Sequence, residues 1–190
     1  MAERLKIGVL ALQGCVEPHL KHLRELNVDV VEVRKPVDLE GLQGLILPGG
    51  ESTTMIRLLK QFNLWTALPD LAQRVPFWGV CAGAILMASE VENPAQEGLD
   101  IINLKVKRNA YGRQQESFQG EVKFTEDGAY SAVFIRAPKF VSWGPEFKVL
   151  GKTNNEVTFL ASKNHMVTAF HPELLPDHWC HLRFLNLVKT

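Results

Sequence analysis

A chain of 190 residues with 46% hydrophobic and 22% charged residues is long enough to bury a sizeable core without disulfide bonds or metal ions. Its 21 lysine and arginine residues balance 21 aspartate and glutamate residues, and a net charge of zero argues against nucleic acid or an anionic membrane as partner. Three scattered cysteines are too few for a disulfide framework, so a reducing, cytoplasmic location is expected. No apolar run is long enough to span a bilayer.

The first part of the chain alternates apolar runs with amphipathic segments. The continuous apolar run at 7–12 is typical of a strand buried on both faces. Further elements are expected as strands at 28–33 and 45–47, and as helices at 16–26, from Ser52 or Thr53 to about Phe62, and at 64–74. This alternation predicts a mostly parallel sheet covered by helices.

The stretch 76–86 predicts a strand that turns sharply into a helix, with Cys81 at the apex. Gly79 and Gly83 flank Cys81 at i−2 and i+2, which is the spacing of the G-x-S-x-G nucleophile elbow with sulfur in place of oxygen. Only small residues fit where such a turn brings backbone segments together. The start of the helix would favour a thiolate. A buried, unreactive cysteine explains the same short pattern, so Cys81 alone does not establish catalysis.

After Ser89 the pattern changes to short strands separated by polar loops. Residues 101–107 alternate apolar and polar side chains, as in a half-exposed antiparallel strand. A run of strands returning to the main sheet is expected at 120–124, 132–135, 147–150, 156–161 and 166–170, and a final helix is expected to open at Pro176. With no internal repeat or linker, the chain is expected to form one domain over residues 1–190.

A histidine and a glutamate follow the last of these strands. Pro172 biases His171 towards an extended conformation, so the side chains of His171 and Glu173 can project on the same side. With Cys81 they would supply a nucleophile, a base and an orienting acid. The Gly49-Gly50 turn exposes backbone N–H groups that, with the N–H of Ala82, could form an oxyanion hole. A plain glycine-rich turn explains that stretch equally well.

Taken together, these segments resemble the class I, triad-type glutamine amidotransferases, and more closely the glutaminase subunits of pyridoxal 5′-phosphate synthases. The matches cover nearly the whole chain, and the most specific segments are 49–52 and 108–114. The resemblance implies an α/β fold, a three-layer α/β/α sandwich with a central mixed, mostly parallel sheet of the flavodoxin-like type. Cys15 and Ala84 depart from the family pattern, and neither departure is expected to touch the chemistry.

The resemblance also implies a function. L-Glutamine would be hydrolysed to L-glutamate and ammonia through a γ-glutamyl thioester on Cys81, with His171 and Glu173 completing the triad. The ammonia would pass to a (β/α)8-barrel synthase subunit within a large hetero-oligomer that makes pyridoxal 5′-phosphate, and the triad would be poorly aligned until that subunit docks. By the same resemblance, glutamine would be held by Gly50, Glu51, Ser52, Arg108, Ile135 and Arg136.

Three other interpretations stay open: a glutaminase subunit of a different amidotransferase, a stand-alone γ-glutamyl hydrolase, and an inactive scaffold subunit. No cofactor is expected. His19 and His22 lie on the first predicted helix, and His178 and His181 open the last. Because neither pair comes with a further cluster of ligands nearby in the sequence, no metal site is expected.

Overall fold

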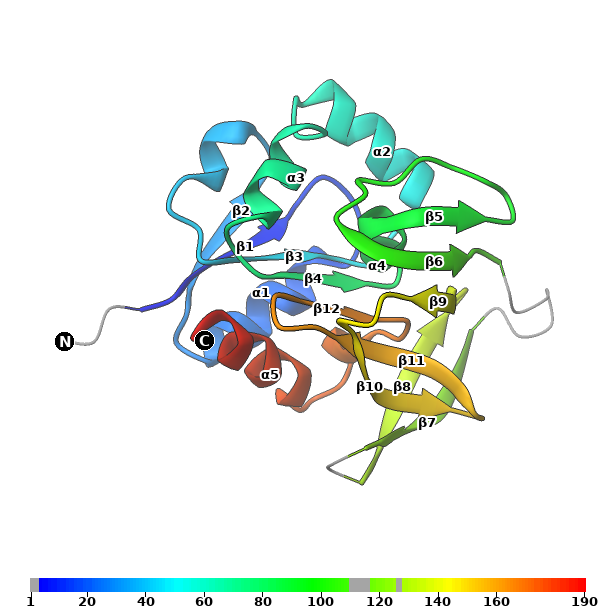
Figure 1. The fold of residues 1–190 in the computed structure, drawn as a ribbon. Helices are drawn as coiled ribbons and strands as arrows, with labels where there is room; N and C mark the ends of the chain where they lie inside the picture. The colour runs from blue at the N-terminus through cyan, green and yellow to red at the C-terminus, as the bar shows by residue number, and fades with distance from the viewer. Residues whose placement is uncertain (1–3, 110–116, 126–127) are drawn as a thin grey trace.

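The computed structural model describes residues 4–109, 117–125 and 128–190 (Figure 1). Its larger sheet is built from nine strands, which are β1 (Lys6–Leu10), β2 (Asp29–Val33), β3 (Gly44–Leu47), β4 (Phe77–Val80), β7 (Ser117–Phe124), β8 (Ala129–Ile135), β10 (Lys148–Thr153), β11 (Glu156–Ala161) and β12 (His165–Thr168). Their spatial order is β2-β1-β3-β4-β12-β11-β10-β7-β8.

The part of this sheet from β2 to β12 is parallel, and the part from β12 to β8 is antiparallel. Every residue of β3 and β4 is buried, which explains why both strands appear in the sequence as continuous apolar runs. The carboxyl ends of the parallel strands meet at one edge of the sheet. In open α/β sheets that edge is where ligands bind.

Helices cover both faces of the sheet (Figure 1). One face carries α1 (Val16–Glu25) and α5 (Trp179–Val188), and the other carries α2 (Ser52–Gln61), α3 (Ala67–Ala72) and α4 (Ala82–Met87). The buried side chains divide accordingly, since Leu20 and Phe184 pack in one apolar cluster while Met55 and Leu68 pack in the other. The predicted three-layer α/β/α sandwich with a mixed central sheet is confirmed.

A second, three-stranded sheet consists of β5 (Ala88–Glu92), β6 (Ile102–Lys107) and β9 (Lys139–Trp143). β6 pairs in parallel with β5 and antiparallel with β9, and it shows the predicted alternation of buried and exposed side chains. β5 and β9 were not predicted. β6 and β9 pair with each other and do not belong to the nine-stranded sheet, whereas the later strands β10, β11 and β12 do.

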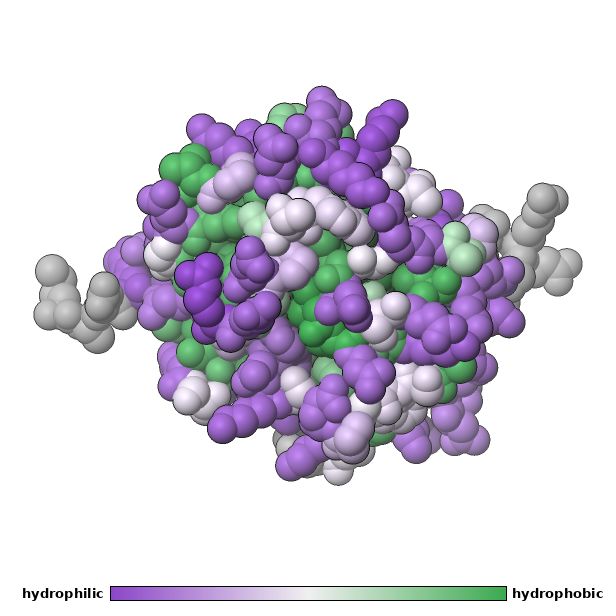
Figure 2. Space-filling model, turned by 45° about the horizontal axis from the view of Figure 1, so that its top comes forward, coloured by the Kyte–Doolittle hydropathy of each residue, from purple (hydrophilic) through white to green (hydrophobic). Residues whose placement is uncertain are grey.

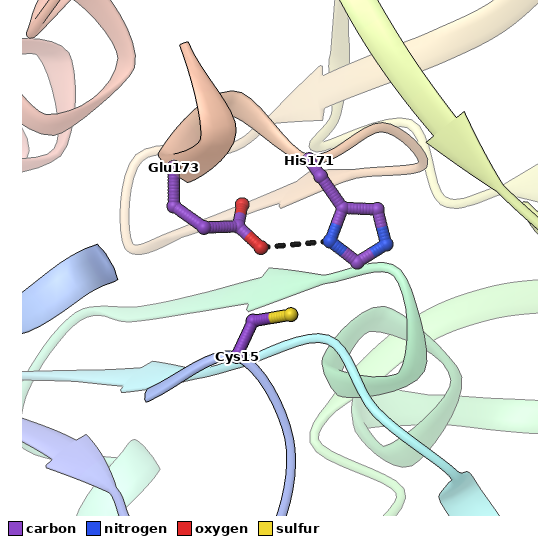
Figure 3. Close-up of side chains that lie close together, drawn as sticks. All are labelled: Cys15, His171 and Glu173. Carbon is purple, nitrogen blue, oxygen red and sulfur yellow. Dashed lines mark hydrogen bonds and ion pairs between the residues drawn. The ribbon is translucent and has the colours of Figure 1, made fainter. Parts of the chain in front are cut away.

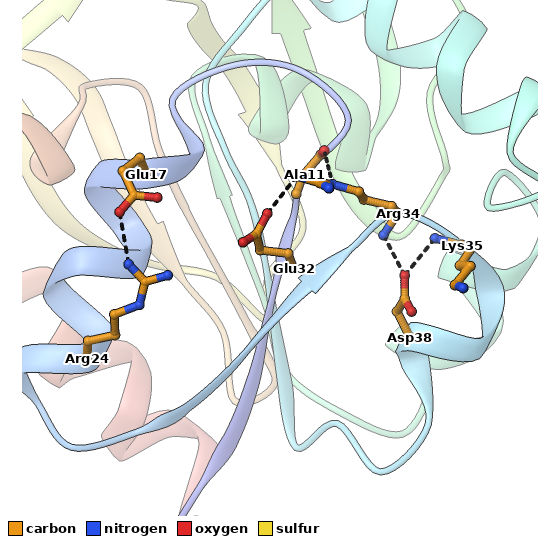
Figure 4. Close-up of polar contacts among 7 residues, drawn as sticks. All are labelled: Ala11, Glu17, Arg24, Glu32, Arg34, Lys35 and Asp38. Carbon is orange, nitrogen blue, oxygen red and sulfur yellow. Dashed lines mark hydrogen bonds and ion pairs between the residues drawn. The ribbon is translucent and has the colours of Figure 1, made fainter.

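Several helices begin or end at residues other than those predicted. The last helix begins at Trp179 rather than Pro176, and α3 is shorter than the predicted 64–74. Short 3₁₀ helices occupy Pro36–Leu39 (η1) and Pro172–Leu174 (η3). Asp38 fixes η1 because its Oδ2 accepts hydrogen bonds from the N–H groups of Arg34 and Lys35, at 2.9 and 3.0 Å (Figure 4).

Hydrophilic side chains dominate the face shown in Figure 2, with apolar side chains visible between them. The most exposed large apolar side chains among the described residues are scattered singly, as is usual for a surface: Val37, Phe62, Val141, Leu174 and Leu182. Within the described part of the chain, no helix combines the length and apolar character needed to cross a membrane.

Candidate active site

Cys81 stands at a sharp turn between β4 and α4. Its backbone has φ 48° and ψ −103°, a strained conformation for a residue with a side chain, and its N–H donates to the Thr168 carbonyl at 2.8 Å. Glycine is required on both sides: a Cβ on Gly83 would lie 1.9 Å from the Leu47 carbonyl oxygen, and one on Gly79 would lie 2.8 Å from the Gly83 backbone. The predicted elbow is therefore present, with its thiol at the carboxyl end of a central parallel strand.

His171 and Glu173 form a buried pair at the carboxyl end of the neighbouring strand β12. His171 Nδ1 and Glu173 Oε1 are 2.7 Å apart (Figure 3). The second carboxylate oxygen of Glu173 lies 3.7 Å from His19 Nε2. Burial would raise the pKa of Glu173, but His19 and His171 outweigh it and lower that pKa. Burial would lower the pKa of His171, but the sulfurs of Cys15 and Cys81 and the Glu173 carboxylate raise it well above its usual range. The pair therefore favours a charged imidazolium.

The three residues of the predicted triad lie together without a closed chain of hydrogen bonds. Cys81 and His171 line the same cavity, and Glu173 lies behind His171. The Cys81 sulfur donates towards the Ile135 carbonyl at 3.7 Å, whereas the buried His171 Nε2 has no hydrogen-bond partner among the described residues. The sulfur is nonetheless close enough to His171 to raise the pKa of the imidazole.

Cys15 corrects one expectation drawn from the sequence. It follows the Gln13-Gly14 turn at the end of β1, and its sulfur lies within 4.8 Å of ligand atoms of both His171 and Glu173 (Figure 3). Its N–H donates to the Gly49 carbonyl at 2.9 Å, which holds the turn against the second glycine turn. This departure from the family pattern therefore does touch the site. The signal in the sequence was its position just after a parallel strand, because such strands converge at this edge.

A cavity of about 270 Å³ opens over Cys81 and His171. All the predicted glutamine-binding and oxyanion residues line it, namely Gly50, Glu51, Ser52, Ala82, Arg108, Ile135 and Arg136. Five residues that were not predicted as site residues line it as well, namely Gln13, Gly14, Cys15, Ile85 and Asn109. Residues 110–114 of the specific segment 108–114 lie outside the described residues.

Glu51 stabilises the start of helix α2, in addition to any role in binding. It is the N-cap of α2, where Ser52 or Thr53 was predicted, and its carboxylate accepts hydrogen bonds from the N–H groups of Thr53 and Thr54. Burial opposes ionisation, but these bonds and that of the Thr53 hydroxyl lower the pKa of Glu51 to about 2. Arg108 Nη2 lies 3.5 Å from Glu51 Oε1. The cavity thus holds a carboxylate that is ionised at neutral pH next to a guanidinium.

Two groups of side chains in the described part of the chain have the spacing to hold a metal ion. One is Cys15, His171 and Glu173, and the other is His22, Glu25 and His178 on the α1/α5 side. The second group brings together two histidines that the sequence places at opposite ends of the chain.

Comparison with known proteins identifies relatives along nearly the whole chain. A family model described as the SNO glutamine amidotransferase family matches residues 9–189. The chain is 44% identical over 187 residues to the pyridoxal 5′-phosphate synthase subunit PdxT of Thermosipho africanus, with 97% of this chain and 100% of that one covered. It is 44% identical over 190 residues to the protein of the same name from Deinococcus radiodurans, with 96% and 97% covered.

Solved structures share the fold. A crystal structure described as a glutamine amidotransferase superposes with a TM-score of 0.90 at 37% identity, covering 97% of this chain and 99% of that one. A glutamine amidotransferase from Thermotoga maritima superposes with a TM-score of 0.62 at 15% identity, covering 98% and 90%, which shows the fold alone.

Proposed function

The chain belongs to the SNO glutamine amidotransferase family, and on this premise we propose that it is the glutaminase subunit of a pyridoxal 5′-phosphate synthase, formed by the whole chain as one domain. In this role it hydrolyses L-glutamine to L-glutamate and ammonia. The proposal rests mainly on one observation: Cys81 on its elbow and His171, bound to the Glu173 carboxylate, line the same cavity. The chain is also similar to such subunits over nearly its full length.

In the proposed reaction, the Cys81 thiolate attacks the side-chain amide carbon of glutamine. The oxygen that becomes negative is held by the N–H groups of Gly50 and Ala82, and one such donor contributes about 3 kcal/mol. Ala82 is the first residue of α4, so its N–H has no partner within the helix. Protonated His171 then donates to the departing ammonia, which leaves a γ-glutamyl thioester on Cys81.

The second half of the reaction hydrolyses the thioester. His171, now neutral, takes a proton from water, the hydroxyl adds to the thioester carbon, and the Cys81 sulfur leaves as glutamate is released. Glu173 keeps its bond to His171 Nδ1 throughout, so that Nε2 faces the reacting groups and the imidazolium is stabilised.

The α-amino and α-carboxylate groups of glutamine need charged partners in the cavity. Arg108 is nearly buried and its Nη1 has no hydrogen-bond partner among the described residues, which suits a clamp on the α-carboxylate. Glu51 stays ionised beside it and is placed to meet the α-ammonium group. Gly50, Ser52, Ile135 and Arg136 complete the proposed glutamine-binding set.

Activity is proposed to depend on a synthase subunit of the (β/α)8-barrel type, in a large hetero-oligomer that receives the ammonia through a tunnel. The Cys81 sulfur donates to the Ile135 carbonyl while His171 Nε2 has no hydrogen-bond partner among the described residues, and this unmade bond between the nucleophile and its base supports the dependence. The complex is proposed to work in the cytoplasm, where the three free thiols of this chain remain reduced.

Glutamate release from glutamine, measured with and without the synthase subunit, tests the proposal. We expect slow hydrolysis by the chain alone, markedly faster hydrolysis in the complex, and no hydrolysis by Cys81→Ala, which should still bind the synthase. Cys180→Ala, a change in a buried thiol outside the cavity, is the matched control. Full activity without a partner, or on γ-glutamyl peptides, would instead indicate a stand-alone hydrolase, and an inactive complex would indicate a scaffold subunit.

A further inference from the structure

Four histidines from opposite ends of the sequence gather between α1 and α5. His19 Nδ1 lies 3.0 Å from His181 Nε2, and the ring of His22 stacks on that of His181 with centroids 4.3 Å apart. At the outer end of this cluster, His22 Nδ1 lies 2.6 Å from His178 Nδ1, and Glu25 Oε2 lies 3.5 Å from His178 Nε2. One ligand atom from each of His22, Glu25 and His178 lies within 4.8 Å of the others.

We propose that His22, Glu25 and His178 bind a divalent transition-metal ion of the zinc class. Two imidazole nitrogens and one carboxylate oxygen are a donor set that Zn²⁺ and its first-row neighbours prefer over Mg²⁺ or Ca²⁺. Three protein ligands leave a fourth tetrahedral position for water.

The hydrogen bonding of His22 prepares it to be a ligand. Its Nε2 lies 3.2 Å from the main-chain carbonyl of Glu173, and a carbonyl only accepts, so Nε2 carries the ring proton. Nδ1 therefore has its lone pair directed towards His178. Metal-bound histidines characteristically donate their other N–H to a carbonyl or carboxylate in this way, which fixes both tautomer and ring orientation. The stacking on His181 further restrains the plane of the ring.

The site has room to adjust and a route from solvent. Two nitrogen ligands of a tetrahedral zinc ion lie about 3.3 Å apart, so the two rings must separate by less than about 1 Å. The side chains of His178 and Glu25 are 30% and 47% exposed and can make this movement, whereas His22 is buried and anchored. A surface hollow lined by Glu17, Lys21, Arg24, Glu25 and the η3 segment leads to His22.

The position at the C-terminal end of α1 favours a cation. His22 and Glu25 lie in the last turn of α1, where the helix dipole favours positive charge. Lys21 and Arg24 line the same hollow and oppose a cation, but Arg24 Nη1 is paired with Glu17 Oε1 at 2.9 Å (Figure 4).

Cobalt titration of the tag-free, metal-stripped full chain tests the proposal, with Zn²⁺ competition measured by calorimetry. We expect one equivalent of Co²⁺ to bind and to give d–d absorption bands without a thiolate charge-transfer band. His178→Ala and Glu25→Gln should each weaken binding at least about tenfold. Both positions are partly exposed, so the variants should fold, which circular dichroism verifies. His165→Gln, a change in a histidine on β12 away from the cluster, should bind as the parent chain does.

Three results would overturn the proposal. The first is that the parent chain takes up no stoichiometric Co²⁺ or Zn²⁺. The second is that folded His178→Ala and Glu25→Gln bind as tightly as the parent chain. The third is a thiolate band that disappears in Cys15→Ala, which would place the ion at Cys15, His171 and Glu173 instead.

Discussion

Gly49 offers a direct test of how His171, the proposed base, is positioned, because the imidazole packs against its backbone. A Cβ added at Gly49 would lie 2.3 Å from His171 Cε1 and 2.9 Å from Nδ1, whereas ordinary contacts begin at 3.4 Å. Gly49→Ala is not disfavoured by its own backbone conformation, since Gly49 is not among the glycines with positive φ. The substitution therefore acts mainly by pushing the imidazole away.

The size of the effect follows from this geometry. The ring must move by about 1 Å, and a displacement of that size costs about 100-fold in rate, or about 2.7 kcal/mol of transition-state stabilisation. The movement also strains the 2.7 Å bond to Glu173. Overpacking a buried position costs about 1–3 kcal/mol in the free energy of unfolding, so a folded variant is expected.

The assay is glutamate release by the complex at saturating glutamine, together with urea unfolding of the isolated chain. Gly120→Ala on β7 is the matched control, because its Cβ would meet only phenylalanine side chains and lies outside the cavity. If folded Gly49→Ala keeps its turnover within about threefold of the parent, the argument that this close approach sets the position of His171 is refuted.

Three further predictions concern charges and thiols at the site. Glu173→Gln should lower kcat by about 10²- to 10⁴-fold, because it removes the carboxylate that orients His171; a near-normal rate would contradict this. Glu51→Gln should cost about 1 kcal/mol in the free energy of unfolding at pH 7. Since the pKa of Glu51 is lowered from 4.5 to about 2, its contribution is complete above pH 4.5 and is lost as the pH falls towards 2, so urea melts of parent and variant should converge there. Cys15→Ala should leave the labelled glutamyl adduct on Cys81 in mass spectra; an adduct on Cys15 in the parent chain would reverse the assignment.

Local patterns in the sequence determined much of the fold. The apolar runs that became β3 and β4 are buried on both faces, and this burial makes them recognisable without knowledge of their neighbours. The glycines around Cys81 likewise report local backbone geometry, which is why the elbow was predictable. The strand before His171 ends earlier than predicted, at Thr168, and Glu173 lies in η3, so the predicted extended alternation is not what brings these two side chains together. The chemistry assigned to them came from residue types and a family resemblance.

The elements that the sequence analysis missed depend on partners far along the chain. β5 and β9 form a sheet only because each pairs with β6, and neither has a clear alternation of its own. Glu51 replaces the predicted cap because its longer side chain folds back onto the first turn of α2. Both the second sheet and the cap of α2 depend on strand pairing and on side-chain geometry. The pattern of residue types along the sequence carries little information about either.

Only the tertiary structure decided what surrounds His171. The carboxyl ends of β1, β4 and β12 meet at one edge of the parallel sheet, and this brings Cys15 and Cys81 to the same imidazole. The packing of α1 beside α5 likewise joins His22 to His178 across 156 positions of sequence. Residue types and local spacing thus determined which groups were available, while sheet order and helix packing decided which of them meet, because those contacts depend on the path of the whole chain.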